Sequence, residues 1–295
     1  MIFERYVAVA HPVFDGKIEN TGRMVIYDHK LMGITDNLIR ETENFGDGRI
    51  VYEVIRCIGG IPLFLEDHLD RLSSSFSAIR PGADPETEAL KSDIRSLILS
   101  EGITDGNIKI VLCEGMSFVF PSAFYYPPET AYMSGVYIGL TEWERQSPNV
   151  KMIVDGYKKK VSDKLSSSGP KGSYFETLLV SSDGRVTEGS RSNVFFYDGN
   201  EILTAPDHVI LKGITRKYVI EAITAAGHAI RYECCEASQI GKRYKSAFLS
   251  GTSIGVLPVS AVEDTILSSA RDPAIKGIRR EYEAIVSSYL ESHAY

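Results

Sequence analysis

The sequence has little of what a disulfide-bonded or metal-binding protein needs. It contains four cysteines, at positions 57, 113, 234 and 235, and they form no C-x-x-C pair. Its six histidines are scattered without the spacing of metal ligands. This cysteine usage is typical of a reducing cytoplasm, where disulfide frameworks are rare. We therefore expect a cytoplasmic protein without a structural metal.

Long hydrophobic runs and an excess of positive charge are also missing. No apolar run approaches the roughly 18 residues that a membrane span requires. The first residues, M-I-F-E-R-Y, place charges ahead of a short apolar run, so no signal peptide is expected. The formal net charge of −7 opposes binding to nucleic acids or to anionic membranes. These features predict a soluble protein without nucleic-acid or membrane partners.

What is present is enough apolar sequence for a sizeable core. The chain has 295 residues, of which 43% are hydrophobic and 24% are charged. This length fits one large domain or two domains of ordinary size. The polar and proline-containing segment 141–149 is the best candidate for a crossover between two domains. The sequence thus predicts an α+β protein with an N-terminal α/β sandwich domain at 1–140 and a second domain at 150–295.

The first half has the pattern of an antiparallel sheet with helices on one side. Two apolar strands at 52–65 are joined at Gly59-Gly60, and the spacing of leucines after Glu66 predicts a helix that ends at Pro81. A second amphipathic helix is expected at 85–100. Two further strands, at 108–113 and 136–140, flank a segment at 116–130 that is rich in aromatic residues and proline and is expected to be a loop.

The second half alternates strands and helices. A strand is expected at 150–154, a short helix at 157–165, and a helix at 215–226 that stops before Gly227. The segment T-E-G-S-R-S-N at 187–193 lies between two apolar strands. Six polar residues and a glycine are poorly suited to a core, so this segment is either a long hairpin loop or part of a functional site.

T-E-G-S-x-S-N followed by an apolar strand resembles the segment that contacts the cofactor's pyridine nitrogen in the fold-type IV pyridoxal-phosphate enzymes. That group contains D-amino-acid aminotransferases, branched-chain aminotransferases and aminodeoxychorismate lyase. The resemblance implies pyridoxal 5'-phosphate as the cofactor, bound in a cleft between two domains of a homodimer. It implies that Glu188 pairs with the protonated ring nitrogen and that Ser190 also binds the cofactor.

The cofactor's phosphate requires hydrogen-bond donors, which the N-terminus of a helix supplies. L-K-G-I-T-R at 211–216 is such a place, although alone it would fit an ordinary helix start. Its distance from the glutamate segment resembles that in the family, and S-G-T-S at 250–253 resembles a second phosphate-binding turn. E-D-H-L-D-R-L at 66–72 matches a family pattern whose arginine binds the phosphate. The residues implied are Ile214, Thr215, Gly251, Thr252 and Arg71.

The resemblance also requires a lysine that forms a Schiff base with the cofactor. P-N-V-K at 148–151 has a proline-containing approach followed by a lysine among apolar residues. Alternation would place Lys151 on the face of the strand opposite Val150 and Met152. Lys158 is the alternative, within a cluster of three lysines that reads as a solvated helix face. The family usually has an asparagine three residues after the lysine, whereas here that residue is Val154.

Substrate recognition is less well marked. The loop after the third strand lacks the arginine and histidine that hold the substrate carboxylate in D-amino-acid aminotransferases. Arg191, three residues after Glu188, offers a planar set of donors for a carboxylate, and Tyr52 and Arg56 of Y-E-V-I-R are further candidates. The dimer is supported in the sequence only by the aromatic segment 116–130, which is more apolar than a free loop.

The expected function is that of a class IV aminotransferase. Such an enzyme moves an amino group between an amino acid, of the D-amino acid or branched-chain type, and a 2-oxo acid. Two alternatives remain open: a lyase of the aminodeoxychorismate lyase type, and a homologue that binds the cofactor but has lost turnover.

Overall fold

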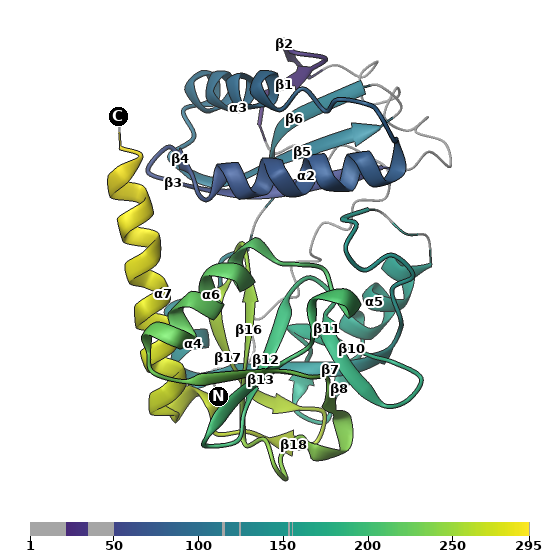
Figure 1. Cartoon of the computed structure of the whole chain (residues 1–295), viewed down its shortest axis with the longest axis vertical. Helices are drawn as coiled ribbons and strands as arrows, with labels where there is room; N and C mark the ends of the chain where they lie inside the picture. Colours follow the sequence, from purple (N-terminus) through teal and green to yellow (C-terminus); the bar gives the residue numbers. More distant parts are fainter. Residues whose placement is uncertain are drawn as a thin grey trace. The chain divides into compact units, whose positions relative to one another are not determined.

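The computed structural model describes residues 22–34, 50–113, 116–123, 125–152, 154 and 156–294 (Figure 1). These residues form both helices and sheets, so the predicted α+β class is confirmed. They divide into two compact units. The N-terminal unit contains the described residues of 22–125, 150–152 and 289–294, and the C-terminal unit contains those of 126–149 and 154–288.

Among the described residues of the N-terminal unit, six strands form one antiparallel sheet in the order β2-β1-β6-β5-β3-β4. Helices α2 and α3 pack on one face of this sheet through a shared hydrophobic cluster. The strands are β1 (Met24–Tyr27), β2 (Lys30–Gly33), β3 (Val51–Ile58), β4 (Ile61–Pro62), β5 (Asp105–Cys113) and β6 (Met116–Ser122), and the helices are α2 (Leu65–Ile79) and α3 (Thr87–Glu101).

Strand β3 follows the alternation expected of a half-buried strand. Val51, Ile55 and Cys57 are buried in the cluster beneath the helices, whereas Tyr52 belongs to a second cluster on the opposite face. Arg56 follows the same alternation as Tyr52 and lies on that opposite face. The strand ends where the two glycines at 59 and 60 adopt positive φ angles of 58° and 81°, which glycine tolerates without steric cost.

The prediction of a loop at 116–130 is wrong for the first half of this segment. Residues Met116–Ser122 form strand β6, which pairs with both β1 and β5. Phe118 and Phe120 point into the same hydrophobic cluster as Tyr52, and both are fully buried. Because these aromatic rings are used within the unit, they give no support to a dimer interface. The proline in this segment lies inside the strand, which misled the composition-based prediction.

The described part of the C-terminal unit contains one mixed sheet of ten strands in the order β14-β13-β12-β16-β17-β7-β10-β11-β15, with β18 paired to β17. Pairings of β7 with β10, β7 with β17 and β13 with β14 are parallel. These strands are β7 (Val136–Glu142), β10 (Glu176–Val180), β11 (Arg185–Gly189), β12 (Asn193–Tyr197), β13 (Glu201–Thr204), β14 (Ala229–Tyr232), β15 (Cys235–Glu236), β16 (Ser246–Gly251), β17 (Gly255–Val262) and β18 (Thr265–Ile266).

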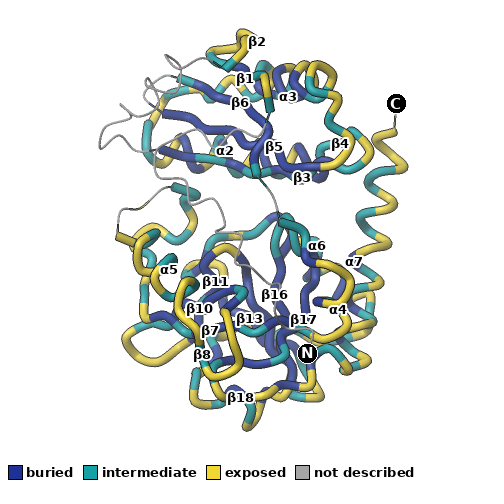
Figure 2. The backbone as a smooth tube through the Cα atoms, turned by 180° about the vertical axis from the view of Figure 1, so that it is seen from behind, coloured by how far each residue is buried: buried dark blue, intermediate teal, exposed yellow. Residues whose placement is uncertain are grey.

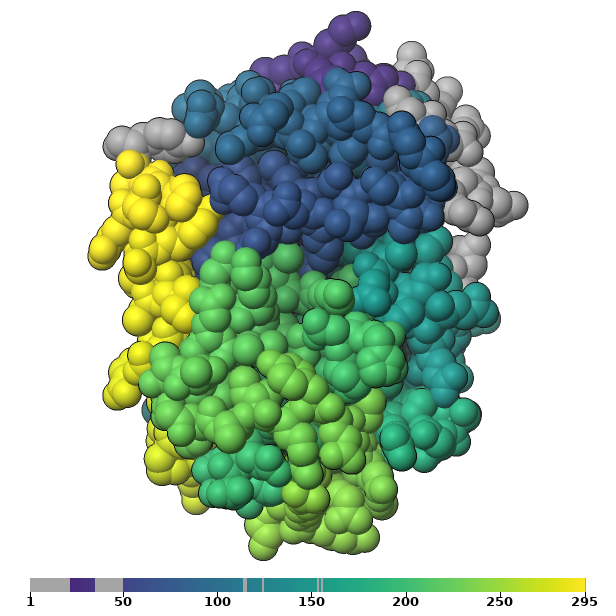
Figure 3. Space-filling view, in the orientation of Figure 1, coloured from purple at the N-terminus to yellow at the C-terminus, as the bar shows by residue number. Residues whose placement is uncertain are grey.

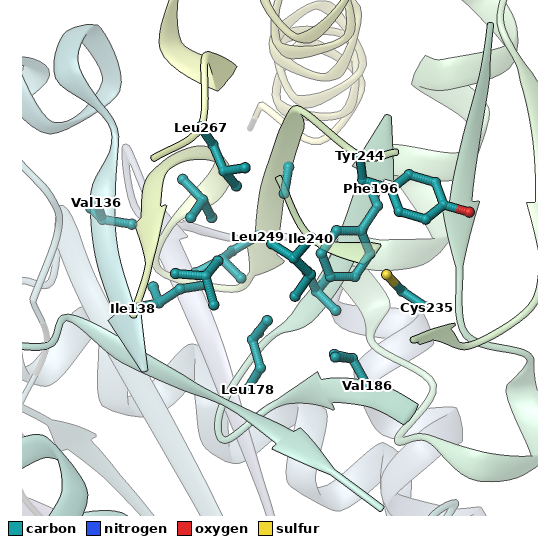
Figure 4. Packing of buried hydrophobic residues seen from close by; sticks show 14 of the residues in the cluster. Val136, Ile138, Leu178, Val186, Phe196, Cys235, Ile240, Tyr244, Leu249 and Leu267 are labelled. Carbon is teal, nitrogen blue, oxygen red and sulfur yellow. The ribbon is translucent and has the colours of Figure 1, made fainter. Parts of the chain in front are cut away.

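Apolar side chains from many of these strands meet in one core (Figure 4). The interior segments of the sheet are buried while the connecting turns are exposed (Figure 2). The surrounding elements are helices α4 (Glu129–Ser134), α5 (Tyr157–Ser166), α6 (Ile214–Ala225) and α7 (Pro273–Ser292), the short hairpin β8 (Ser168–Gly169) and β9 (Gly172–Ser173), and three single turns of 3₁₀ helix, η1 (Asp207–Val209), η2 (Ala237–Gln239) and η3 (Ser269–Arg271).

The two units differ from the predicted division at 140 and 150. Strand β7 belongs to the C-terminal unit because its neighbours are β10 and β17. Residues 150–152 belong to the N-terminal unit, where Met152 forms an isolated bridge with Val51 and the Tyr52 amide donates to the Lys151 carbonyl at 3.2 Å. The strand predicted at 150–154 is therefore reduced to this single bridge in the described residues.

The end of α7 belongs to the N-terminal unit. Helix α2 begins after Phe64, which has a left-handed backbone and no side-chain cap. The first amide of this helix, from Leu65, donates instead to the hydroxyl of Tyr289 at 3.1 Å, and that hydroxyl donates to Glu66 at 2.8 Å. Helix α2 lies at the surface of its unit (Figure 3). None of the helices in the described segments is long and apolar enough to cross a membrane.

Candidate functional site

The acid predicted to meet a ring nitrogen, Glu188, lies on β11 and is only 3% exposed. Its Oε2 accepts a hydrogen bond from the amide of Leu211 at 3.2 Å. Its Oε1 lies 2.7 Å from Nε of Arg145, a contact that has the distance of an ion pair without hydrogen-bond geometry. A buried carboxylate is thus held between a backbone amide and a guanidinium.

The turn after Glu188 is organised by a second buried acid, Glu176 of β10. Its carboxylate accepts hydrogen bonds from the amide of Arg191 at 3.2 Å, the hydroxyl of Ser192 at 3.1 Å and the hydroxyl of Ser190. The Ser190 hydroxyl, which the sequence assigned to the cofactor, is therefore engaged with Glu176. The side chain of Arg191 is exposed. Glu176 contacts this residue only through its backbone amide.

Leu211 connects this turn to the predicted phosphate-binding segment. Its amide donates to Glu188, and its carbonyl accepts a hydrogen bond from Nδ2 of Asn193 at 3.0 Å. Asn193 also packs against Gly213, where an added Cβ would lie 2.1 Å from Oδ1 of the asparagine. Only glycine fits at 213 without a shift, so the G-I-T motif and the S-N motif depend on each other.

Helix α6 begins directly after this contact. Gly213 is its N-cap and provides no side-chain cap, so the amides of the first turn, including those of Ile214 and Thr215, are oriented as in an anion-binding helix start. Both residues are buried. The direction of this first turn is fixed by Arg216, which is 4% exposed and donates to the Ala205 carbonyl at 2.9 Å and to Asp207 at 2.8 Å.

The third predicted segment, S-G-T-S, reaches the same end of the sheet. Ser250 is the register partner of Asn193 in the ladder between β12 and β16. A Cβ added to Gly251 would lie 3.6 Å from the carbonyl oxygen of Arg191. The structure thus brings the glutamate segment, the start of α6 and the turn that contains Gly251 and Thr252 together in the C-terminal unit.

An aromatic and cationic cluster borders Glu188. The guanidinium of Arg145 lies 5.1 Å from the ring centroid of Tyr157, and that ring is 5.3 Å from the ring of Trp143. The hydroxyl of Tyr157 donates to the carbonyl of Ser190 at 2.6 Å. Lys158, the alternative Schiff-base lysine, follows Tyr157 in α5 and is half-buried.

Arg71 of the N-terminal unit is part of a buried charge network on α2 and β3. Its Nε and one terminal nitrogen donate to the two oxygens of Glu53, each at 2.7 Å, and Nδ1 of His68 lies 2.8 Å from the same carboxylate. Burial alone would raise the pKa of Glu53, but the Arg71 guanidinium and the His68 hydrogen bond outweigh it and hold that pKa well below its usual range. Burial lowers the pKa of His68 and outweighs the Glu53 carboxylate, which raises it, while the cations Arg71 and Lys151 lower it further.

Lys151 lies in the same unit, over Tyr52. Its Nζ is 4.9 Å from the ring centroid of Tyr52, and Nζ of the buried Lys109 is 5.5 Å from that ring. Val150 and Met152 pack instead against the hydrophobic cluster beneath the helices. The side chains therefore alternate as predicted, although the segment forms a single bridge rather than a strand.

Comparison with known proteins places this geometry in a family. The profile described as Amino-transferase class IV matches residues 50–262, which is more than half of the chain. The chain belongs to the class IV aminotransferase family. Among curated proteins, this chain is 29% identical over 252 residues to the D-alanine aminotransferase of Bacillus licheniformis, covering 80% of this chain and 86% of that protein.

Solved structures show the same fold. The branched-chain amino acid aminotransferase of Thermobaculum terrenum, solved in its PLP form, superposes on this chain with a TM-score of 0.73 at 19% identity, covering 92% of this chain and 95% of that one. A Legionella pneumophila protein assigned as a 4-amino-4-deoxychorismate lyase has a TM-score of 0.68 at 19% identity, covering 82% and 91% of the two chains. The fold alone therefore does not separate transfer from elimination.

Several residues of the class IV aminotransferase site were missed by sequence reasoning. Arg145 lies in the predicted crossover, where an arginine reads as a surface residue. Glu176 opens strand β10, and no feature of the sequence marks it as a residue of the site. Asn193 and Leu211 act through their contact with one another across 18 positions. No local pattern in the sequence marks such a contact. The one available signal was that the asparagine of the T-E-G-S-R-S-N motif directly precedes an apolar strand, where a buried side chain is expected.

Proposed function

We propose that this protein is a pyridoxal 5'-phosphate-dependent aminotransferase that moves an amino group between an amino acid and a 2-oxo acid. Its amino donor is a D-amino acid or a branched-chain amino acid. The observation that carries the proposal is the double contact of Leu211, which joins the buried acid Glu188 to the start of α6 through Asn193. A buried carboxylate and an uncapped helix start, held at a fixed separation, suit a ligand with a protonated aromatic nitrogen and a phosphate.

The residues of the C-terminal unit fit the cofactor. Glu188 would accept a hydrogen bond from the protonated ring nitrogen, while the amides of Ile214 and Thr215 and the Thr215 hydroxyl would bind the phosphate. Gly251 and Thr252 add donors from the second turn, and Ser190 shapes the wall beside the ring. When bound, the cofactor supplies an electron sink for charge that develops at the substrate α-carbon.

Arg71 contributes a further phosphate contact in this proposal. Its guanidinium has five N–H donors, and Glu53 takes two of them in the structure. A guanidinium is a planar donor group of the kind that binds phosphate well. Glu53 and His68 keep the group in one orientation, so the arginine is prepared to bind before the ligand arrives.

Lys151 is the proposed point of covalent attachment and the carrier of the α-proton. Its ammonium lies over the Tyr52 ring, which restricts its rotamers and keeps it close to one position. The neutral amine of a lysine is the form that can attack a carbonyl or accept a proton. Lys158 is the alternative position for this role.

The substrate carboxylate is assigned to Arg191, Arg56 and Tyr52. The exposed side chain of Arg191 leaves a turn whose backbone is fixed by Glu176, so a ligand can approach it. Arg56 and Tyr52 share one face of β3. An arginine paired with a carboxylate forms two parallel hydrogen bonds, which would fix the orientation of the amino acid.

The test is an assay with both substrates varied. Purified protein loaded with pyridoxal 5'-phosphate is incubated with D-alanine or with L-leucine, each with and without 2-oxoglutarate, and the products are separated by chiral chromatography. An aminotransferase forms a new amino acid only when an acceptor is present. Release of a 2-oxo acid from 4-amino-4-deoxychorismate without an acceptor would instead identify a lyase, and cofactor binding without either product would identify an inactive homologue.

A further inference from the structure

We propose that Arg145 is the positioning residue for Glu188, which it keeps charged and correctly aimed toward the cofactor ring nitrogen. This inference rests on the proposed function. The side chain of Arg145 is 15% exposed and that of Glu188 is 3% exposed, with 2.7 Å between Nε and Oε1. A carboxylate this deeply buried is costly unless a partner compensates its charge.

The guanidinium is itself held in place. It lies against the ring of Tyr157, 5.1 Å from the centroid, in an arrangement suited to a cation–π interaction. The hydroxyl of Tyr157 is hydrogen-bonded to the carbonyl of Ser190, two residues after Glu188 in the sequence. Arg145 and the turn that follows Glu188 are thus fixed by the same tyrosine.

The chemistry follows from the number of acceptor sites on a carboxylate. An ionised carboxylate has about four lone-pair sites, and Leu211 and Arg145 approach different oxygens of Glu188. A guanidinium beside the carboxylate favours its ionised form, which is the form that accepts a hydrogen bond from a protonated ring nitrogen. Without Arg145, a buried glutamate would favour the neutral acid, which binds a protonated ring nitrogen poorly.

The test is a double-mutant cycle on the full chain. Arg145→Met and Arg145→Lys are each made in the natural background and in Glu188→Gln. Cofactor-free protein is titrated with pyridoxal 5'-phosphate, and binding is followed through Trp143, the single tryptophan of the sequence, whose ring is next to Tyr157. Urea unfolding of the cofactor-free variants gives a second readout that does not involve the cofactor.

If Arg145 acts through Glu188, Arg145→Met raises the dissociation constant about tenfold, equivalent to about 1.4 kcal/mol, when Glu188 is present. In the Glu188→Gln background the same substitution raises it by less than about twofold, because the charge to be compensated is gone. Arg145→Lys, which keeps the positive charge, falls between the natural protein and Arg145→Met. In urea, Glu188→Gln restores most of the stability that Arg145→Met removes.

Arg185→Met is the matched control, since Arg185 is on the same strand as Glu188 and pairs with Asp183 where both side chains are exposed. Its effects are expected to be small in both backgrounds. Equal losses for Arg145→Met in the two backgrounds would mean that Arg145 only packs against Tyr157, and the proposal would be wrong. If Arg145→Met does not fold, the comparison of Arg145→Lys in the two backgrounds tests the proposal in its place. Failure of the natural protein to bind pyridoxal 5'-phosphate would reject the proposed function, while the urea cycle would still test the pair.

Discussion

Asn193 and Gly213 lie so close together that a Cβ at position 213 would be 2.1 Å from Oδ1 of the asparagine. The contact joins the strand after Glu188 to the N-cap of α6. Gly213→Ala is expected to push the two segments apart and to weaken cofactor binding about tenfold, with a smaller loss of stability. Titration with pyridoxal 5'-phosphate and thermal unfolding measure the two effects.

The control for that substitution is Gly277→Ala in the interior of α7, where nothing lies within 4 Å of the added Cβ. Alanine in a helix interior is favoured over glycine by up to about 1 kcal/mol, so this variant should be neutral or more stable. Equal cofactor binding in the two variants would show that the Asn193–Gly213 contact is not needed for the site.

Lys151→Ala should abolish covalent attachment of the cofactor. Reduction of the loaded protein with borohydride fixes the cofactor to the lysine that carries it, and peptide mapping identifies the position. Lys151 and Lys158 are seven positions apart, so fragmentation of the labelled peptide distinguishes the two candidates. Lys158→Ala serves as the control and should label normally. A label on Lys158 would move the catalytic position to α5.

Glu188→Gln should leave the cofactor bound but slow turnover by about a hundredfold or more, since a neutral amide does not keep the ring nitrogen protonated. The phosphate contacts of α6 are unchanged in this variant, which is why binding persists. The measurement is kcat alongside the cofactor dissociation constant. An unchanged kcat would mean that another group serves the ring nitrogen.

Arg191→Ala should raise KM for the amino acid at least about tenfold, a loss of about 1.4 kcal/mol of binding, with little effect on cofactor retention. The side chain is exposed and Glu176 holds only the backbone amide at this position, so the substitution should not disturb the turn. Steady-state kinetics with the donor varied provides the measurement. An unaltered KM would leave Arg191 as a surface residue.

Acid should destabilise the N-terminal unit in two steps. The pKa of His68 is lowered from 6.5 by burial, so the unfolded chain binds the extra proton first and stability is lost as pH falls below that value. Burial would raise the pKa of Glu53, but the Arg71 guanidinium and His68 outweigh burial and lower that pKa from 4.5, so the contribution of Glu53 is lost as pH falls further.

Urea unfolding between about pH 7 and about pH 5 tests the first step, since only the histidine window lies in that range. His68→Gln should flatten the dependence there, while a wild-type midpoint that does not change across this range would contradict the predicted contribution.

Much of the candidate site could be predicted because its residues lie in short local sequence motifs. Glu188 and the G-I-T segment could be named from their neighbours along the chain. The structure joins Glu188 to the residues before α6 through the Leu211 amide, while the roles of these residues stay predictions. The family assignment is confirmed by the profile match. Most helices were also found within a few residues, since their apolar spacing depends on the helix itself.

Long-range relationships were less accessible to sequence reasoning. Residues 150–152 were assigned to the second domain because they follow the crossover, but a backbone hydrogen bond between Tyr52 and Lys151 places them in the first. Strand β6 was expected to be a loop because aromatic residues and proline together suggested irregular structure. Its true state depends on its pairing with β1 and β5, which no single segment reveals.

The hydroxyl of Tyr289 has a consequence for the order in which this protein can fold. The first amide of α2 donates to that hydroxyl, and the two residues are 224 positions apart. A ribosome delivers the N-terminal residues first, at roughly 5–20 residues per second. Helix α2 can therefore form early, but its start acquires this hydrogen bond only after Tyr289 has been synthesised. The first amide of the helix that bears Arg71 thus waits for a residue that is made after nearly all of the C-terminal unit.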